Sequence, residues 1–175
     1  MKKKRTNKKK VDLTTLVNQK VECKGCKKGI KMCHRRSCVG TVADLKKIIA
    51  KGYAKRLMID YYGSEEKGVD NIYYLCGASN GNECSKADWN PTGTCSFLIN
   101  EKCEIHDIKP VLGAVACCKR DAGNFEAERE AVLATWTTPE GKELIKKWKK
   151  QVKYKEKEDD SGFSLISALE LMLTH

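Results

Sequence analysis

Hydrophobic residues recur every three or four positions in the segment that follows Thr41, which places them on one face of a helix. Thr41 is suited to cap the start of this helix, and Asp44, three residues later, occupies the matching position of a capping box. We therefore predict a helix from about residue 42 to 52, whose far end is weakened by Gly52. The hydrophobic positions are Leu45, Ile48, Ile49 and Tyr53.

The last third of the chain carries further amphipathic helix patterns. Residues 124–136 predict one helix, whose packing residues are Phe125, Ala131, Val132 and Trp136. Thr138 followed by Pro139 is typical of a helix start, and we expect this second helix to run to about residue 157. Its apolar stripe consists of Leu144, Ile145, Trp148 and Val152, and eight lysines between 142 and 157 lie mostly opposite. Residues 164–173 predict a short final helix.

The middle of the chain predicts strands and loops. Residues 71–76, NIYYLC, are β-branched and aromatic and predict a strand. Residues 56–63 either extend the preceding helix or form a short strand. Residues 94–107 predict a tight hairpin with a cysteine on each arm, and residues 23–40 an irregular basic loop. A short helix within residues 11–22 and a turn at 65–68 complete the pattern.

These elements predict an α+β fold: a small, irregular, cysteine-rich metal-binding domain with a short hairpin and a C-terminal helical extension. We expect residues 1–11 to be a disordered basic tail, residues 12–120 to form the cysteine-cluster domain, and residues 121–175 to form the extension. A length of 175 residues allows a hydrophobic core, so folding does not require cross-links.

Ten cysteines make sulfur chemistry the main functional indication. The chain starts without the apolar run of a signal peptide and carries no segment as apolar as a membrane span, so we expect a cytoplasmic location. Thiols stay reduced there, which favours metal ligands over disulfides or unligated structural thiols. The expected ligands are Cys23, Cys26, Cys33, Cys38, Cys76, Cys84, Cys95, Cys103 and Cys117.

The spacing of these cysteines leaves their grouping open. Cys23 and Cys26 form a CxxC pair of the kind that delivers two thiolates to one ion. Cys33 and Cys38 complete a four-cysteine site with that pair, or join Cys95, Cys103 and Cys117 from the second half of the chain. We expect only one of the adjacent Cys117 and Cys118 to bind a given ion, since their side chains diverge. His34 and His106 are weaker ligand candidates than the thiols.

Soft thiolate ligands suit one or two Zn²⁺ ions or, alternatively, a [4Fe-4S] or other iron–sulfur cluster. The chain lacks the cysteine run of bacterial ferredoxins, which favours zinc. It also lacks a phosphate-binding glycine loop and an HExxH motif, so no catalytic residues are assigned and enzymatic activity stays open.

The formal charge of +11 comes mostly from the amino-terminal tail. Residues 1–10 carry seven positive charges and no acid, so the rest of the chain has a formal charge of +4. Such a tail is typically a solvated terminus, and it is also suited to phosphate contacts with nucleic acid or to a protein partner.

The order of the cysteine motifs resembles the YkgJ-type cysteine-cluster family, which is described as putative zinc- or iron-chelating. The resemblance covers about residues 20–120 and rests on the early cysteine group, TVADL at 41–45, CSFL at 95–98, CEIH at 103–106, Lys109-Pro110 and the following cysteines. The early cysteines are more widely spaced than in the CxxCxxCC pattern, and Lys109 stands where the family usually has arginine. The resemblance implies metal binding without a settled activity.

Three functions fit these observations. The first is a metal-stabilised binding module for a protein or nucleic acid. The second is an iron–sulfur protein with a redox or side-chain-modifying role, and the third is a metal-handling or metal-sensing protein.

Overall fold

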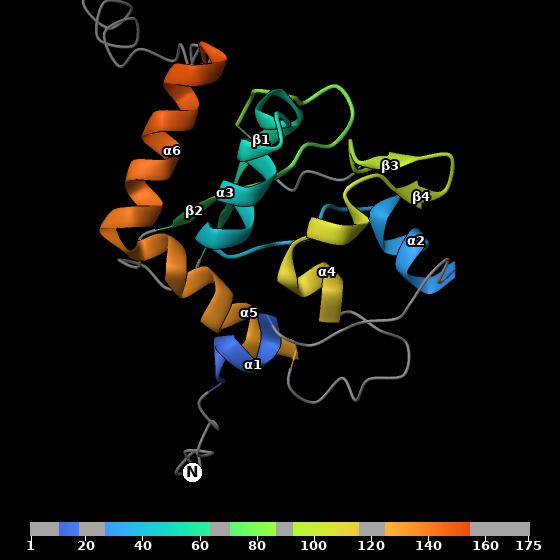
Figure 1. The fold of residues 1–175 in the computed structure, drawn as a ribbon, viewed down its shortest axis with the longest axis horizontal. Helices are drawn as coiled ribbons and strands as arrows, with labels where there is room; N and C mark the ends of the chain where they lie inside the picture. The colour runs from blue at the N-terminus through green and yellow to red at the C-terminus, as the bar shows by residue number, and fades with distance from the viewer. Residues whose placement is uncertain (1–10, 18–26, 64–70, 87–92, 116–124, 155–175) are drawn as a thin grey trace, which may run out of the picture.

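The computed structural model describes residues 11–17, 27–63, 71–86, 93–115 and 125–154 (Figure 1). The helices described are α1 (Leu13–Val17), α2 (Lys27–Cys33), α3 (Val42–Ala50), α4 (Val111–Val115), α5 (Phe125–Ala134) and α6 (Pro139–Val152). The strands are β1 (Leu57–Tyr62), β2 (Ile72–Gly77), β3 (Leu98–Ile99) and β4 (Lys102–Cys103). Short 3₁₀ turns lie at η1 (Ala54–Arg56), η2 (His106–Ile108) and η4 (Thr135–Thr137).

Helix α3 starts as its sequence predicts. The Thr41 side chain accepts a hydrogen bond from the Asp44 amide at 3.2 Å, and the Asp44 carboxylate accepts one from the Thr41 amide at 2.9 Å. This reciprocal capping box satisfies two amides that the first helical turn leaves unpaired. The helix ends at Ala50, shortly before Gly52, whose φ of +90° suits glycine.

Two antiparallel strand pairs form the sheets among the described residues. Strands β1 and β2 pair from Leu57 opposite Gly77 to Tyr62 opposite Ile72, so residues 57–62 form a strand rather than extending the helix. The predicted strand at 71–76 is confirmed. The predicted hairpin is also present, but β3 and β4 have only two residues each. Cys103 lies on β4, whereas Cys95 precedes β3.

The prediction of an irregular loop over residues 23–40 is wrong for residues 27–33, because Lys27–Cys33 form helix α2, whereas residues 34–40 lie outside any helix or strand as predicted. Ile30 and Cys33 lie three residues apart and both line the cavity described below, so burial of one face supports this helix. The flanking residues 18–26 lie outside the described part of the chain, as do the predicted turn at 65–68 and the predicted final helix.

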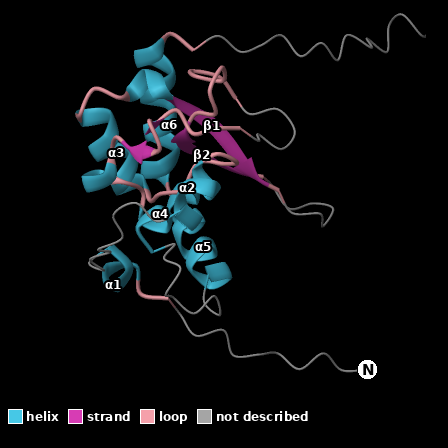
Figure 2. Ribbon diagram, turned by 90° about the vertical axis from the view of Figure 1, so that its right-hand side faces the viewer, coloured by secondary structure: helices cyan, strands magenta, loops and turns pink. Residues whose placement is uncertain are grey.

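Helices α5 and α6 share one hydrophobic core with α3, β1 and β2. Trp136 and Trp148 are both buried, and their indole N–H groups donate to the carbonyl oxygens of Gly40 and Ala54, each at 2.8 Å. We call this region the tryptophan core; its other members include Leu45, Ile48, Leu133 and Leu144. Figure 2 shows α6 beside the β1–β2 pair, with α1, α4 and α5 at the opposite end.

The predicted start and stripe of the second C-terminal helix are confirmed. Thr138 caps α6 by accepting from the Gly141 amide, and Pro139 is its first residue. The helix ends at Val152, earlier than expected. Phe125, expected to pack, is 38% exposed, because it lies at the very start of α5 rather than facing the core.

A smaller apolar cluster joins α1, α4 and α5 through Leu16, Val111, Leu112, Val115 and Val132. Through this cluster α4 packs against α1 and α5, and it lies to the left of α2 in Figure 1. None of the helices among the described residues is both long and apolar enough to cross a membrane.

Candidate metal centre

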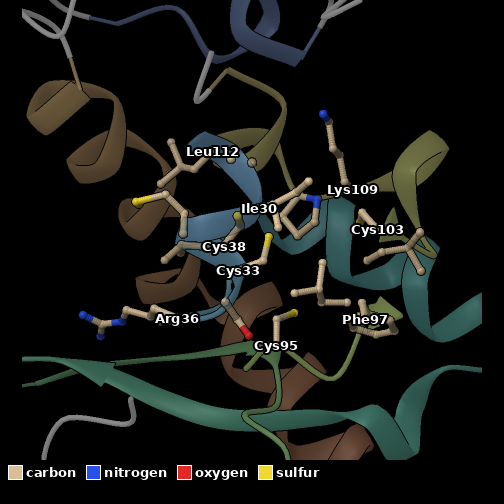
Figure 3. Close-up of a pocket in the computed structure, with 18 of the residues that line it drawn as sticks. Ile30, Cys33, Arg36, Cys38, Cys95, Phe97, Cys103, Lys109 and Leu112 are labelled. Atoms are coloured by element: carbon tan, nitrogen blue, oxygen red, sulfur yellow. The ribbon is translucent and has the colours of Figure 1, made fainter. Parts of the chain in front are cut away.

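Four of the predicted cysteine ligands line a single cavity of about 640 Å³, which we call the cysteine cavity. Cys33 ends α2 and Cys38 lies between α2 and α3, whereas Cys95 and Cys103 belong to the segment that forms the β3–β4 hairpin. Figure 3 shows Cys33 and Cys38 next to each other, with Cys95 and Cys103 reaching the same space from other parts of the chain. Folding therefore brings together thiols separated by some 60 residues of sequence.

The backbone ties the two cysteine-bearing segments directly to each other. The Cys95 amide donates to the Cys33 carbonyl at 2.7 Å, and the Gly93 amide donates to the Arg35 carbonyl at 2.9 Å. These bonds place the end of α2 beside the chain that enters β3. The positions of Cys33 and Cys95 are thus fixed by main-chain pairing and not by their side chains alone.

The thiols of Cys33 and Cys38 interact strongly. The hydrogen bond from the Cys38 thiol lowers the pKa of Cys33 from 9.0 to about 7, against the opposing effect of burial and with help from His34 and Lys109. The same bond, together with burial and the neighbouring cysteines Cys33, Cys95 and Cys103, raises the pKa of Cys38. One thiol of the pair is therefore poised to become a thiolate, which is the form that binds metal.

Burial raises the pKa of the other two cavity cysteines. For Cys95 and Cys103 it is the largest cause, and the nearby Cys33 adds to it in both. Lys109 opposes the rise at Cys103. Several thiols in one low-dielectric space repel each other as thiolates, so a bound cation would favour their joint ionisation.

Two glycines allow the backbone to approach these sulfurs closely. A Cβ atom on Gly113 of α4 would lie 2.8 Å from the Cys38 sulfur, and a Cβ on Gly77 of β2 would lie 3.2 Å from the Cys95 sulfur. Any larger residue would push into the thiols. Helix α4 and the end of β2 therefore form tight walls around the sulfur group.

The TVADL and Lys109-Pro110 motifs meet beside the cavity. The buried Asp44 carboxylate accepts from the Val111 amide at 3.1 Å, besides capping α3. A Cβ on Gly40 would lie 2.9 Å from the Pro110 side chain. Asp44 thus joins the start of α3 to the start of α4 and fixes the turn that carries Lys109 to the cavity wall.

Arg56 fastens the hairpin segment to the β1–β2 pair. Its guanidinium lies 4.6 Å from the centre of the Phe97 ring and donates to the Glu104 carboxylate and the Ser96 carbonyl. Ser96 in turn donates through its hydroxyl to the Arg56 carbonyl at 2.9 Å. Ser96 and Phe97 directly follow Cys95 and Glu104 directly follows Cys103, so these contacts help to hold both cysteines in place.

The remaining predicted ligands have different positions. Cys76 is buried on β2 opposite Met58, and burial raises its pKa, followed by effects of Asp60 and Cys95. Cys84 lies apart: its thiol donates to the Lys55 carbonyl at 3.3 Å, and no other cysteine affects its pKa. Cys23, Cys26 and Cys117 lie outside the described residues, as does Cys118.

The two histidines are not equivalent. His34 is exposed, and its Nε2 lies 2.9 Å from the carboxylate of Glu101 in the turn of the β3–β4 hairpin. His106 is half-buried at the start of η2 and lines the cysteine cavity. His106 is therefore the better placed of the two to supply a nitrogen ligand.

The donor set of the cavity is chemically suited to a soft metal. Four thiols match the preference of Zn²⁺ and of iron–sulfur clusters. Within the described ranges, however, no three or more Cys, His, Asp or Glu side chains are already arranged to hold a metal ion. The thiols line one cavity, and ion binding would require their side chains to turn toward a common point.

The cavity also contains groups that the sequence patterns did not single out. Arg36 lines it and pairs with the buried Asp60, which also accepts from the Tyr74 hydroxyl. An acidic residue in the centre of the apolar strand LMIDYY was the available signal, since a buried carboxylate needs partners. Which residues pair with Asp60 could not be predicted, because Arg36 and Tyr74 reach it only in the folded chain.

The chain matches no family model, no curated protein and no solved structure. The resemblance to the cysteine-cluster family therefore stays a prediction.

Proposed function

We propose that this protein binds a metal ion through Cys33, Cys38, Cys95 and Cys103 and acts as a metal-stabilised binding module. The observation that carries the proposal is the convergence of these four thiols, from two separate stretches of the chain, on one cavity. A tetrahedral Zn²⁺ site uses four such ligands. Metal bound there would join α2 to the β3–β4 hairpin and so contribute directly to stability.

The chain's own residues would prepare the site in three ways. Main-chain bonds align Cys33 with Cys95, the Cys38 thiol promotes ionisation of Cys33, and Lys109 offsets negative charge near Cys33 and Cys103. A metal supplies the positive charge that lets the remaining thiols ionise together. His106 lines the cavity and would serve as a replacement ligand or a hydrogen-bonding support.

An iron–sulfur cluster is the second candidate, because the cavity is large enough to hold one. A space of about 640 Å³ exceeds what one ion needs, and the thiols are equally suited to iron. Absorbance of protein purified without air separates the two, because a brown protein absorbing near ~400 nm indicates a cluster. A colourless protein with stoichiometric zinc would exclude it.

The partner of such a module would meet the basic surfaces of the chain. On α6 the side chains of Lys142, Lys146, Lys147 and Lys150 are exposed, opposite the buried Leu144 and Trp148. A gel-shift assay with duplex and single-stranded nucleic acid tests one class of partner, since phosphate contacts weaken as salt rises. Absence of a shift at low salt would leave a protein partner.

The decisive test compares Cys103→Ala with Cys84→Ala. Cys103 lies in the cavity wall, whereas Cys84 is remote from it, so the two variants remove one thiol each in different places. We expect elemental analysis to show a large loss of metal, and thermal unfolding a lower Tm, for Cys103→Ala only. Full metal content and an unchanged Tm in Cys103→Ala would refute the assignment.

A further inference from the structure

The cysteine cavity extends beyond the thiols to the β1–β2 pair, where two arginines line it. Arg36 comes from the segment between α2 and α3, and Arg129 from the middle of α5. Figure 3 shows the Arg36 guanidinium on the opposite side of Cys38 and Cys33 from Cys103. The thiols therefore occupy one part of the cavity and the guanidinium groups another.

Arg36 pairs with the buried carboxylate of Asp60. Asp60 is 2% exposed, and its Oδ2 accepts from Arg36 Nη2 at 3.1 Å and from the Tyr74 hydroxyl at 2.7 Å. Its Oδ1 accepts from the Tyr61 amide at 2.8 Å. Asp60 engages one nitrogen of a side chain that is 48% exposed, which leaves further N–H donors of Arg36 for a ligand.

Arg129 carries an unpaired donor. Its guanidinium lies 4.8 Å from the centre of the Tyr62 ring, and Nη2 donates to the Tyr62 hydroxyl at 3.2 Å and to Glu126 at 2.5 Å. Its Nε is buried and has no hydrogen-bond partner within the described residues. A buried N–H of this kind is destabilising until an acceptor reaches it.

The two arginines approach the same face of the sheet. Their partners Asp60 and Tyr62 lie two residues apart on β1, so these side chains project on one side of the strand at a spacing of about 7 Å. Tyr74 pairs opposite Asp60 and also lines the cavity. Both arginines therefore approach neighbouring positions on this face of β1, and both line the same cavity.

The other walls of the cavity are mostly apolar, and basic side chains outnumber acidic ones among its lining residues, while Asp60 and Glu126 each pair with one of the arginines from outside the lining. Among the described residues that line it, the basic side chains are Arg36, Lys102, Lys109 and Arg129, whereas the one acid, Glu101, pairs with His34. Hydrophobic lining comes from Ile30, Val39, Leu112, Phe125 and Leu133. Sites for small organic molecules combine such walls with a few polar groups that orient the ligand.

We propose that this cavity binds a small organic carboxylate with an apolar body, whose carboxylate accepts from Arg129 and Arg36. Planar guanidinium groups match the two oxygens of a carboxylate, and the apolar walls accommodate a hydrocarbon body. The proposal rests on the arginines and the cavity shape, and not on the thiols or on a metal.

The test uses isothermal titration of the full-length protein with octanoate and with 1-octanol, which share an eight-carbon chain. We expect octanoate to bind about tenfold more tightly than octanol, because only the carboxylate accepts from the two arginines. Equal affinities, or no binding of octanoate, would overturn the proposal. The metal content of the same samples is measured as well. If the protein contains metal but does not bind octanoate, this inference is wrong while the proposed metal site stands.

Two variants locate the anion. Arg129→Gln should weaken octanoate binding about tenfold while leaving octanol binding unchanged. Lys47→Gln on the exposed face of α3 removes the same charge outside the cavity and should change neither. Arg36→Gln is the second variant, with its Tm measured because Asp60 loses a partner. Octanoate affinity that is unchanged in a folded Arg129→Gln protein would also overturn the proposal, and the octanoate–octanol comparison decides it if both variants fail to fold.

Discussion

The tryptophan core and the cysteine cavity adjoin the same β1–β2 pair but differ in how fully their polar groups are satisfied. In the tryptophan core both indole N–H groups have carbonyl acceptors and the surrounding side chains are buried. In the cysteine cavity the pKa of Cys33 is lowered and that of Cys38 is raised. The cavity also contains an unpaired Arg129 Nε and about 640 Å³ of space. The first region has its indole donors paired, whereas the second has the space and the unpaired donor that the proposed ligands would use.

This difference indicates that the tryptophan core contributes most to stability, whereas the cysteine cavity is the candidate for binding. Burial of large apolar side chains is the main favourable term in folding, and it is concentrated where α3, α6 and the sheet meet. Unsatisfied donors and crowded thiols lower stability in the free protein and are relieved by binding. The predictions below separate the two regions, beginning with the largest expected effect.

Truncation of Trp148 should cause the largest loss of stability. Trp148 is 0% exposed and donates to the Ala54 carbonyl, so Trp148→Ala leaves a cavity and an unpaired acceptor. We expect the free energy of unfolding to fall by about 3–5 kcal/mol in chemical denaturation, with or without a chelator. Lys147→Ala, on the exposed side of the same helix, should change it by less than about 0.5 kcal/mol. A loss below about 1 kcal/mol at Trp148 would mean that this region does not dominate stability.

Removal of the Asp44 carboxylate should have the next largest effect, because Asp44 links both regions. Asp44→Ala unpairs the buried amides of Thr41 and Val111 and should lower the free energy of unfolding by about 2 kcal/mol. Asp107→Ala, which removes a fully exposed carboxylate, is the matched control and should be nearly neutral. Equal stabilities for the two variants would show that α3 and α4 are joined by packing rather than by Asp44.

Gly113→Ala should act mainly on the cysteine cavity. Alanine favours a helix by about 1 kcal/mol over glycine, but its Cβ would lie 2.8 Å from the Cys38 sulfur. Overpacking of this kind costs about 1–3 kcal/mol, so we expect a net loss of about 1 kcal/mol and a lower metal content. Ala114→Ser, at the neighbouring position, should leave metal content unchanged. A more stable Gly113→Ala protein with normal metal content would show that Cys38 can move freely.

The smallest effect concerns reactivity rather than stability. In metal-free protein the pKa of Cys33 is lowered to about 7, mainly by the Cys38 thiol, whereas burial raises the pKa of Cys84 above 9.0. The thiolate of Cys33 thus forms as pH rises through about 7, and its alkylation by iodoacetamide should increase over that range. Peptide mass spectrometry measures each site separately. Zinc should suppress the reaction at Cys33 and not at Cys84, and similar pH profiles at both sites would contradict the Cys33–Cys38 interaction.

The elements with strong local signals could be predicted from the sequence. The capping box at Thr41 and Asp44, the strand at β2, and the Thr138-Pro139 start of α6 follow from short-range hydrogen bonding and hydrophobic periodicity. The α+β character follows from their combination. Helix α2 was missed because its stability depends on burial of one face against distant residues.

The amino-acid sequence by itself determined the supply of thiols, the capping motifs and the apolar stripes that become the tryptophan core. Only the tertiary structure decided that Cys33, Cys38, Cys95 and Cys103 share a cavity while Cys84 stands apart. It likewise decided that Arg36 and Arg129 reach the same face of β1. The physical reason is that capping and periodicity act over a few neighbouring residues. A binding site depends on contacts between distant segments, and their separation along the chain does not determine how close they lie in space.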